Sequence, residues 1–250
     1  MNSIEKSIEI LNYLSNSKKS VRVAEICSRF HFPKSTVHRI LNILLNYSLV
    51  NKEQNTSKYR LGLQVLKYSN SFYDSFDLRE IANPILKKIC METDLTTYLT
   101  TWYTNRSICI DSVRPPRVIN THFSVEIGNE MPFHCTSSTK VILAYQYPEE
   151  IKKIIYEKPL KKYTPKTIVD PKKLEEHLSK IKENGFAICD EELEEGVKAI
   201  AAPVRNIYGK VMASITIVGL SNRISNNSER LTKILVNSTK QLSNMLGYKE

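Results

Sequence analysis

Long apolar runs, glycine and proline are all scarce in this chain of 250 residues. It holds seven glycines and ten prolines, so it is neither collagen-like nor a low-complexity chain. None of its apolar runs reaches the roughly 20 residues that a membrane-spanning helix needs. The amino terminus reads MNSIEKSIEILNYL, where acids interrupt the apolar pattern, so we expect no secretory signal. With 41% hydrophobic and 25% charged residues, the chain is expected to form one or two globular domains in the cytoplasm.

Cysteine is present, but its positions match no known pairing pattern. No CxxC pair occurs and the number of cysteines is odd, so we expect neither a disulfide framework nor a ribbon-type zinc site. The five are Cys27, Cys90, Cys109, Cys135 and Cys189. The motifs GxGxxG, GxSxG, HExxH and the P-loop are absent as well. The sequence therefore predicts no enzyme, no cofactor and no bound metal.

Positive charge is concentrated near the amino terminus. The net charge is +10 at pH 7, and residues 1–70 hold eleven Lys or Arg against four Glu, which places +7 in that segment. A polyanion is the natural partner for such a segment, although a solubilising surface has the same composition.

The first 45 residues have the pattern of three short amphipathic helices. Apolar residues recur at helical spacing from Ile4 to Leu14, and Ser20 is a candidate cap for a second helix that carries Val23, Ile26 and Phe30. After His31-Phe32, Pro33 suits the first turn of a third helix. The apolar stripe of that helix is Val37, Ile40, Leu41, Leu44 and Leu45.

The opposite side of the third helix is rich in hydrogen-bond donors near its start. Such residues read base edges and bind phosphates when a helix lies in the major groove, and two helices, a turn and a polar third helix form a helix-turn-helix. The predicted DNA contacts on this helix are Lys34, Ser35, Thr36, His38 and Arg39. Tyr59 and Leu61 then alternate with Lys58 and Arg60, as in a half-buried strand. This basic hairpin is typical of a wing, and we expect Lys58 and Arg60 to contact phosphate.

Residues 65–77 are interpreted as a linker helix between residues 1–64 and 78–250. Tyr68, Phe72 and Phe76 recur every four residues. An amphipathic pattern continues to Ile89, interrupted by Pro84. The apolar face of this stretch either pairs with another subunit or packs on its own carboxyl-terminal domain.

The carboxyl-terminal segment mixes strand and helix patterns without a regular βαβ alternation. This favours an α+β fold on an antiparallel sheet. Strands are expected at 96–101, 107–113, 118–123, 186–188, 199–205 and 211–218, and helices at 138–147, 149–157, 171–184 and 228–246. The acidic run from Asp190 to Glu195 is interpreted as a solvated loop rather than a metal cluster.

Two other functions compete for this segment. An enzyme would use Cys135 or Cys189 as the nucleophile and His134 or His122 as the base, which requires a proximity that sequence does not show. A metal sensor would use His122, His134 or Cys135 with nearby acids, at spacings that match no recognised site. We rank both below a DNA-binding regulator.

Three stretches of the chain resemble the IclR family of transcriptional regulators, over nearly its full length. They are Pro33–Leu41 with Tyr59–Gly62, Pro132–Lys140, and the segment from Gly185 through Glu195-Gly196 to Val204. The resemblance implies a winged helix-turn-helix, a linker helix and a GAF-like effector-binding domain. It also implies dimers through the amino-terminal domains, often assembled into tetramers. The implied function is that of a regulator, expected to be a repressor, whose binding to double-stranded operator DNA responds to a small organic acid.

The resemblance also implies a set of effector-binding residues. The backbone N–H groups of Ser137 and Ser138, at a helix start, are expected to hold a carboxylate. The other positions carried over are Asn120, Phe123, Cys189, Val197, Ala199, Thr216 and Val218.

The chain departs from the family pattern in both domains. Members that bind small keto acids commonly have Asp where this chain has Cys189, Cys where it has Ala199, and two serines where it has Thr216 and Val218. An acceptor for an effector hydroxyl is therefore missing, so we expect a larger, more apolar acid than glyoxylate or pyruvate. His31 and Ser48 replace glycines that are common in the family, so we expect slightly altered turns and an intact fold.

Overall fold

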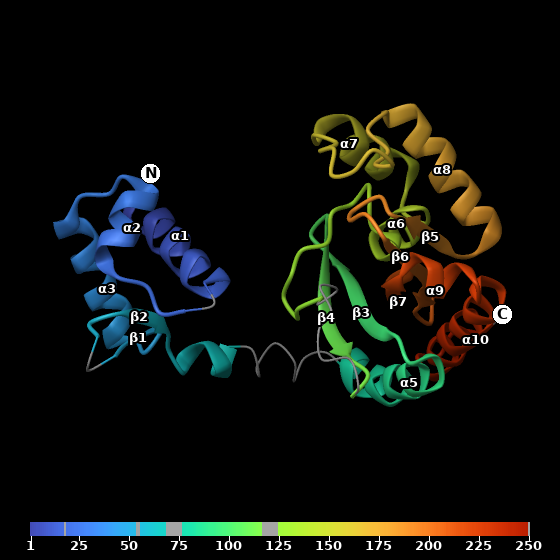
Figure 1. Ribbon diagram of the computed structural model, residues 1–250, viewed down its shortest axis with the longest axis horizontal. Coiled ribbons are helices and arrows are strands. Elements are labelled where there is room, and N and C mark those ends of the chain that lie inside the picture. Colours follow the sequence, from blue (N-terminus) through green and yellow to red (C-terminus); the bar gives the residue numbers. More distant parts are fainter. Residues whose placement is uncertain (18, 54–55, 69–76, 117–124, 250) are drawn as a thin grey trace. The chain divides into compact units, whose positions relative to one another are not determined.

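The computed structural model describes residues 1–17, 19–53, 56–68, 77–116 and 125–249. The chain divides into two compact units, Met1–Phe76 and Asp77–Glu250, which are described separately below (Figure 1). The stretch expected as a linker helix is helical over 64–68, and its remainder up to residue 76 lies outside the described residues.

The amino-terminal unit is built on three helices, α1 (Ser3–Asn16), α2 (Val23–Phe30) and α3 (Lys34–Asn46). The predicted stripe of α3 is confirmed, since Val37, Ile40, Leu41 and Leu44 are buried and Leu45 is half-buried. The prediction for α1 was partly wrong. Ile10 and Leu14 are its buried residues, whereas Ile4 and Ile8 are 73% and 51% exposed.

The turns that flank α3 use left-handed backbone at non-glycine residues. His31, at the end of α2, and Ser48, after α3, both have φ of +55°. These are the two positions where the family commonly has glycine, and the helices on either side of them form. Helix α3 begins at Lys34, one residue after Pro33.

The expected cap of α2 was wrong. Arg22 is the capping residue, and its backbone N–H donates to Glu25 Oε1. The Ser20 hydroxyl instead donates to Glu53 Oε1 at 2.5 Å. This hydrogen bond therefore connects the segment before α2 to the hairpin that follows α3.

That hairpin consists of strands β1 (Val50–Lys52) and β2 (Tyr59–Leu61), paired antiparallel. Val21, between α1 and α2, adds a bridge by exchanging two backbone hydrogen bonds with Tyr59. The unit is thus a helix-turn-helix with a short wing, and strand β2 of the wing is hydrogen-bonded to the segment between α1 and α2.

The carboxyl-terminal unit is an α+β domain on a five-stranded antiparallel sheet, as expected. The strand order is β4-β3-β7-β6-β5. The strands are β3 (Thr96–Tyr103), β4 (Arg106–Val113), β5 (Ala187–Asp190), β6 (Val197–Arg205) and β7 (Val211–Leu220). The strand expected at 118–123 lies outside the described residues.

Different helices cover the two faces of this sheet (Figure 1). Helix α6 (Ser137–Leu143) packs on β6 and β7, with α7 (Pro148–Glu157) and α8 (Pro171–Asn184) beyond it. Helices α5 (Asp77–Thr93) and α10 (Ser228–Met245) cover the other face, and α9 (Ser221–Ser225) follows β7 directly. Helix α5 continues through Pro84, so the expected interruption was wrong.

Candidate DNA interface and ligand cavity

The predicted DNA-contacting residues of α3 lie on its solvent-facing side. Lys34, Ser35, His38 and Arg39 are exposed and Thr36 is half-buried, while the apolar stripe of the same helix faces the core. The helical repeat produces this separation, because it places the polar and the apolar positions on opposite sides. The helix therefore presents a polar surface close to its start.

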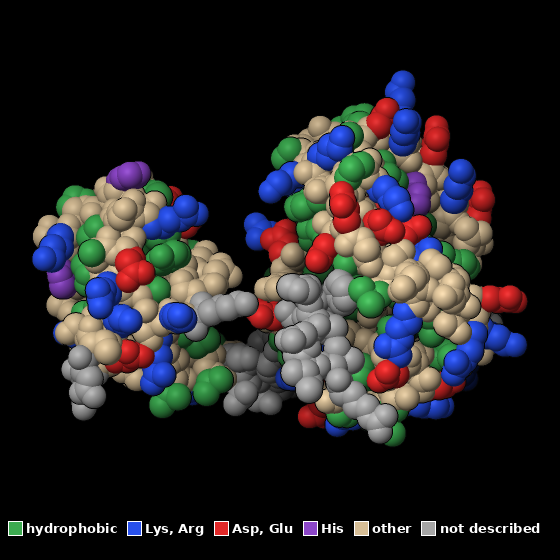
Figure 2. Space-filling view, in the orientation of Figure 1, with side chains coloured by type: hydrophobic (Ala, Val, Ile, Leu, Met, Phe, Trp, Pro, Cys, Tyr) green, Lys and Arg blue, Asp and Glu red, His purple; other side chains and the backbone are tan. Residues whose placement is uncertain are grey.

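The charges on this unit are available to a polyanion. Among the described residues, no salt bridge involves Lys34, Arg39 or Arg60. The Arg39 guanidinium lies 3.5 Å from the Ser3 hydroxyl, which carries no charge. In Figure 2 the charged side chains on the visible face of this unit are mostly Lys and Arg.

The wing places its two bases differently. Arg60 of β2 is exposed opposite Asn51, whereas Lys58 is half-buried just before the strand. Glu53, an acid of the same hairpin, accepts hydrogen bonds from the Ser20 and Thr56 hydroxyls, and these bonds lower its pKa, with smaller contributions from Arg60 and Lys58. The carboxylate is thus held by hydroxyl groups, and the two bases remain available for phosphate.

The carboxyl-terminal unit contains a cavity of about 140 Å³ between α6 and the sheet. Five of the predicted ligand-binding residues line it, namely Ser137, Cys189, Val197, Ala199 and Val218. Ser138 and Thr216 are buried but do not line it. Asn120 and Phe123 lie outside the described residues.

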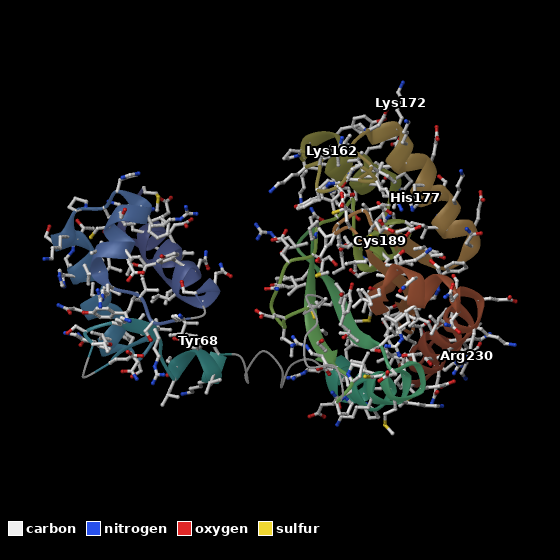
Figure 3. All side chains as sticks on the ribbon, in the orientation of Figure 1. Tyr68, Lys162, Lys172, His177, Cys189 and Arg230 are labelled. Atoms are coloured by element: carbon white, nitrogen blue, oxygen red, sulfur yellow. The ribbon has the colours of Figure 1, made fainter. Side chains whose placement is uncertain are left out.

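Strand pairing brings the distant parts of this set together. Cys189 of β5 is opposite Ala199 of β6, and Ala199 is opposite Val218 of β7. Because residues directly opposite each other share a face, these three side chains form a row across the sheet beneath α6. Figure 3 shows Cys189 in this region, between the strands and α6.

Several residues that line the cavity were not predicted from the sequence, and Cys135 was considered only for a catalytic or metal-binding role. The missed residues are Tyr98, Val125, Met131, Thr136, Leu193 and Glu194. Thr136 and Cys135 stand inside the motif at the start of α6, so that motif was a usable signal. Tyr98 lies opposite Thr216 across β3 and β7, a relation that only the strand register reveals.

The polar part of the cavity lining comes from Tyr98, Thr136, Ser137 and Glu194. Ser137 Oγ is buried without a hydrogen-bond partner among the described residues. Burial raises the pKa of Tyr98 far above its ordinary value, although the neighbouring Ser138 and Thr216 hydroxyls oppose this effect. Tyr98 therefore keeps its phenolic proton. Buried polar atoms without partners are uncommon and call for a ligand or a water molecule.

The two cavity thiols are unsuited to nucleophilic catalysis. Burial raises the pKa of Cys135 to about 12 and also raises that of Cys189, so both are neutral thiols near pH 7. Cys189 Sγ donates to the Cys135 carbonyl at 2.9 Å. His134, next in sequence to Cys135, uses its Nε2 to bond the Lys161 carbonyl at 2.8 Å. No thiol–imidazole pair is formed among the described residues.

The acidic run is not simply a solvated loop, and that expectation was wrong for one of its members. Glu192 is buried and its Oε1 lies 2.5 Å from Nζ of Lys140, which is fully buried in α6. Within the described ranges, which exclude His122, no group of three or more His, Cys, Asp or Glu is placed to hold a metal ion. None of the described helices is long and apolar enough to cross a membrane.

Comparison with known families gives matches to both units. The profile "IclR helix-turn-helix domain" matches residues 3–54, and "Bacterial transcriptional regulator IclR C-terminal" matches residues 71–244. The chain is similar to the transcriptional regulator KipR of Bacillus subtilis, with 28% identity over 98% of this chain and 97% of KipR. It is also similar to the Escherichia coli transcriptional repressor IclR, with 27% identity over 90% of this chain and 82% of IclR.

Solved structures share the fold along nearly the whole chain. An IclR transcriptional regulator from Alicyclobacillus acidocaldarius superposes with a TM-score of 0.83 and 27% identity, covering 98% of both chains. An IclR homologue from Microbacterium hydrocarbonoxydans, solved in complex with 4-hydroxybenzoate, gives a TM-score of 0.85 at 21% identity, over 98% of this chain and 99% of that one.

Proposed function

The chain belongs to the IclR family of bacterial transcriptional regulators, and on that basis we propose that it represses transcription in response to a small apolar organic acid bound in the α6 cavity. As in its relatives, which are named transcriptional regulators and repressors, its activity is non-enzymatic DNA binding. The observation that carries the effector proposal is the cavity itself, which has an apolar wall and a buried Ser137 hydroxyl without a partner among the described residues.

We assign the reading of operator sequence to α3 and the positioning on phosphate to the wing. Exposed Ser35, His38 and Arg39 supply donors for base edges, while Lys58 and Arg60 supply charge without sequence information. The exposed position of the α3 residues and the absence of salt bridges to Arg39 and Arg60 among the described residues support this division. Such a regulator acts in the compartment that holds the genome, so we assign it to the cytoplasm.

The size and chemistry of the cavity favour a compact ligand that carries an aromatic or branched group. A cavity of about 140 Å³ resembles in volume the engineered apolar cavity that binds benzene. Cys189, Ala199 and Val218 give the cavity an apolar wall, which suits a ligand with an apolar body better than glyoxylate or pyruvate. The hydroxyls of Ser137 and Tyr98 are donors suited to a carboxylate or phenol oxygen. The homologue that binds 4-hydroxybenzoate makes that compound a suitable probe.

We further propose that the protein acts as a homo-oligomer, a dimer or a tetramer, with residues 65–77 as the linker between its domains. Ile4 and Ile8 of α1, with Leu63, Leu66 and Tyr68 after the wing, are large apolar side chains that remain exposed within one chain. Covering such residues with a second copy would remove apolar surface from water.

Two binding experiments test this function. Fluorescence anisotropy on the DNA upstream of its own gene should show salt-dependent, sequence-preferring binding. Calorimetry should detect 4-hydroxybenzoate more readily than glyoxylate. Ala199→Phe, which fills the cavity, should abolish the 4-hydroxybenzoate signal, while Leu220→Phe, at an exposed position outside the cavity, should leave it unchanged. Micromolar glyoxylate binding would contradict the proposed effector class.

A further inference from the structure

A buried ion pair joins two parts of the chain that form the cavity wall. Lys140 lies in α6 one turn after Ser137, and Glu192 directly precedes Leu193 and Glu194 in the loop between β5 and β6. Lys140 Nζ donates to Glu192 Oε1 at 2.5 Å and lies 3.3 Å from Nε2 of His177. Neither Lys140 nor Glu192 lines the cavity. The ion pair instead lies outside the cavity, next to the residues that form its wall.

The loop of residues 191–196, here called the rim loop, is held by side chains from outside the sheet. The Thr164 hydroxyl donates to the Glu191 carbonyl and the Thr167 hydroxyl to the Glu192 carbonyl, both at 2.6 Å. Lys166 Nζ lies 3.3 Å from Glu191 Oε1, and in this pair Lys166 is exposed and Glu191 is half-buried. The Lys140–Glu192 contact is the buried attachment between the rim loop and α6.

The pair is close to the thiols that mark the cavity. The charges of both Lys140 and Glu192 act on the pKa of Cys135 and of Cys189, with Lys140 lowering each value and Glu192 raising it. Figure 3 shows His177 on α8, on the side that faces α6, with Cys189 nearby on β5. The ion pair therefore lies between α8 and the cavity wall.

The energetics make this contact sensitive to the removal of one partner. A buried carboxylate is tolerated when it is paired, and removal of its partner leaves an uncompensated charge that is best relieved by exposure to water. Glu192 Oε2 lacks a hydrogen-bond partner among the described residues. The buried negative charge of Glu192 is therefore stabilised mainly by the Lys140 ammonium group at Oε1. Without Lys140, the simplest relief is movement of the rim loop away from α6.

We propose that Lys140 and Glu192 are positioning residues that hold the rim loop against α6 and thereby control ligand access to the cavity. Leu193 and Glu194 close the cavity while the pair is intact, and a ligand enters when the pair separates. This inference rests on the proposed function of the cavity as the effector site. Its test uses neither ligand nor DNA, so its failure is distinguishable from failure of that function.

Cysteine alkylation measures this opening directly. N-ethylmaleimide is added to the full-length protein at pH 7.5, and mass spectrometry follows each cysteine separately. Cys135 and Cys189 report on the cavity, while buried Cys90 in α5, on the other face of the sheet, reports on general unfolding. Lys140→Met should accelerate alkylation of Cys135 and Cys189 by roughly tenfold or more and leave Cys90 unchanged.

Three further variants make the test specific. Lys140→Met combined with Glu192→Leu replaces the pair by apolar side chains and should restore protection to within about twofold of the original protein. Arg223→Met removes an exposed ion pair with Asp94 and should change nothing. If Lys140→Met does not fold, Lys140→Gln, which keeps a hydrogen-bond donor for Glu192, should still accelerate alkylation of the cavity thiols, by about threefold. Loss of the lysine charge raises the pKa of both thiols, so faster alkylation reports access and not a larger thiolate fraction. Unchanged cavity thiols, or equal acceleration at Cys90, would overturn the proposal.

Discussion

Gly62, at the end of the wing, lies directly against the backbone of Ser48, in the turn that follows α3. A Cβ atom at position 62 would come within 2.1 Å of the Ser48 carbonyl oxygen. The same turn is held by backbone hydrogen bonds from Gly62 to Leu49 and from Gln64 to Ser48. The absence of a side chain at one residue therefore fixes how closely the wing approaches the end of α3.

Replacing Gly62 by Ala should destabilise the amino-terminal unit by about 2–3 kcal/mol, because two backbone segments must separate to admit the methyl group. Trp102, the single tryptophan, lies in the other unit and provides an internal comparison. The transition seen by circular dichroism should shift to lower temperature while that of Trp102 fluorescence stays in place. Asn51→Ala, at an exposed residue of β1 in the same wing, is the matched control. Equal stability of the two variants would show that the wing does not need this close approach.

The left-handed backbone at Ser48 leads to a prediction of opposite sign. A non-glycine residue in this region carries a conformational penalty, which glycine does not, although glycine loses more freedom on folding. Ser48→Gly should therefore stabilise the amino-terminal unit slightly, by up to about 1 kcal/mol. Urea unfolding followed by circular dichroism measures the change. A decrease in stability would show that the Ser48 side chain makes an interaction that outweighs the strain.

Lys58 and Arg60 are expected to contact phosphate alone. Replacing both by Gln should weaken binding to operator and unrelated DNA by the same factor, and should reduce the slope of log K against log salt by about 1 for each phosphate contact removed. Anisotropy titrations at several salt concentrations measure this slope. Lys162→Gln with Lys172→Gln, at exposed lysines of the other unit, serves as the control (Figure 3). If the double variant weakened operator binding more than binding to unrelated DNA, Lys58 or Arg60 would contact bases and not phosphate alone.

His177 should make the carboxyl-terminal unit less stable in acid. Burial and the nearby ammonium groups of Lys140 and Lys180 lower its pKa from 6.5 to about 4. Between these values the unfolded chain binds a proton that the folded chain does not, so stability falls as pH decreases from about 6.5 to 4, by about 1–2 kcal/mol after allowance for partial exposure. Urea unfolding followed by Trp102 fluorescence measures this.

The variant His177→Gln isolates this contribution. The lowered pKa of His134 acts in the same direction, and the raised pKa of Glu192 acts in the opposite one, so the unmodified protein reports their sum. The variant should lose less stability than the original protein over the same pH range. An identical pH profile would show that His177 is not held neutral.

Ser137 should matter for the ligand more than for the fold. Its buried hydroxyl has no partner among the described residues, so Ser137→Ala should leave stability unchanged or slightly raised. If the hydroxyl donates to the effector, the same variant should weaken binding of 4-hydroxybenzoate by about 5–10-fold. Calorimetry and thermal unfolding on one preparation test both halves. Unaltered affinity would remove Ser137 from the binding site.

Periodic hydrophobic patterns in the sequence predicted most helices and strands well. They did not predict interactions between residues that are distant in the sequence. The stripe from Val37 to Leu44 and the pattern of 171–184 identified their helices because one face repeats at helical spacing. The sequence predicts an interruption at Pro84, yet α5 continues through it, since its packing on β3 and β4 outweighs a local preference.

The cavity residues that could be predicted from the sequence are those that belong to short family-like motifs. Ser137, Cys189 and Ala199 belong to stretches that resemble the family, and strand register then places them together. Tyr98 and the pair of Lys140 with Glu192 were not identified, because a buried charge and its partner 52 residues away look like ordinary surface residues in a sequence.

The coupling between the two units is best tested by asking whether ligand and operator change each other's affinity by the same factor. Operator affinity is measured with and without saturating 4-hydroxybenzoate, and affinity for 4-hydroxybenzoate is measured with and without operator. We predict a change of about 5–150-fold, equal in the two directions, as linkage between two sites requires. A compound that fills the cavity and leaves operator affinity unchanged would contradict the claim that the two units work as one regulator.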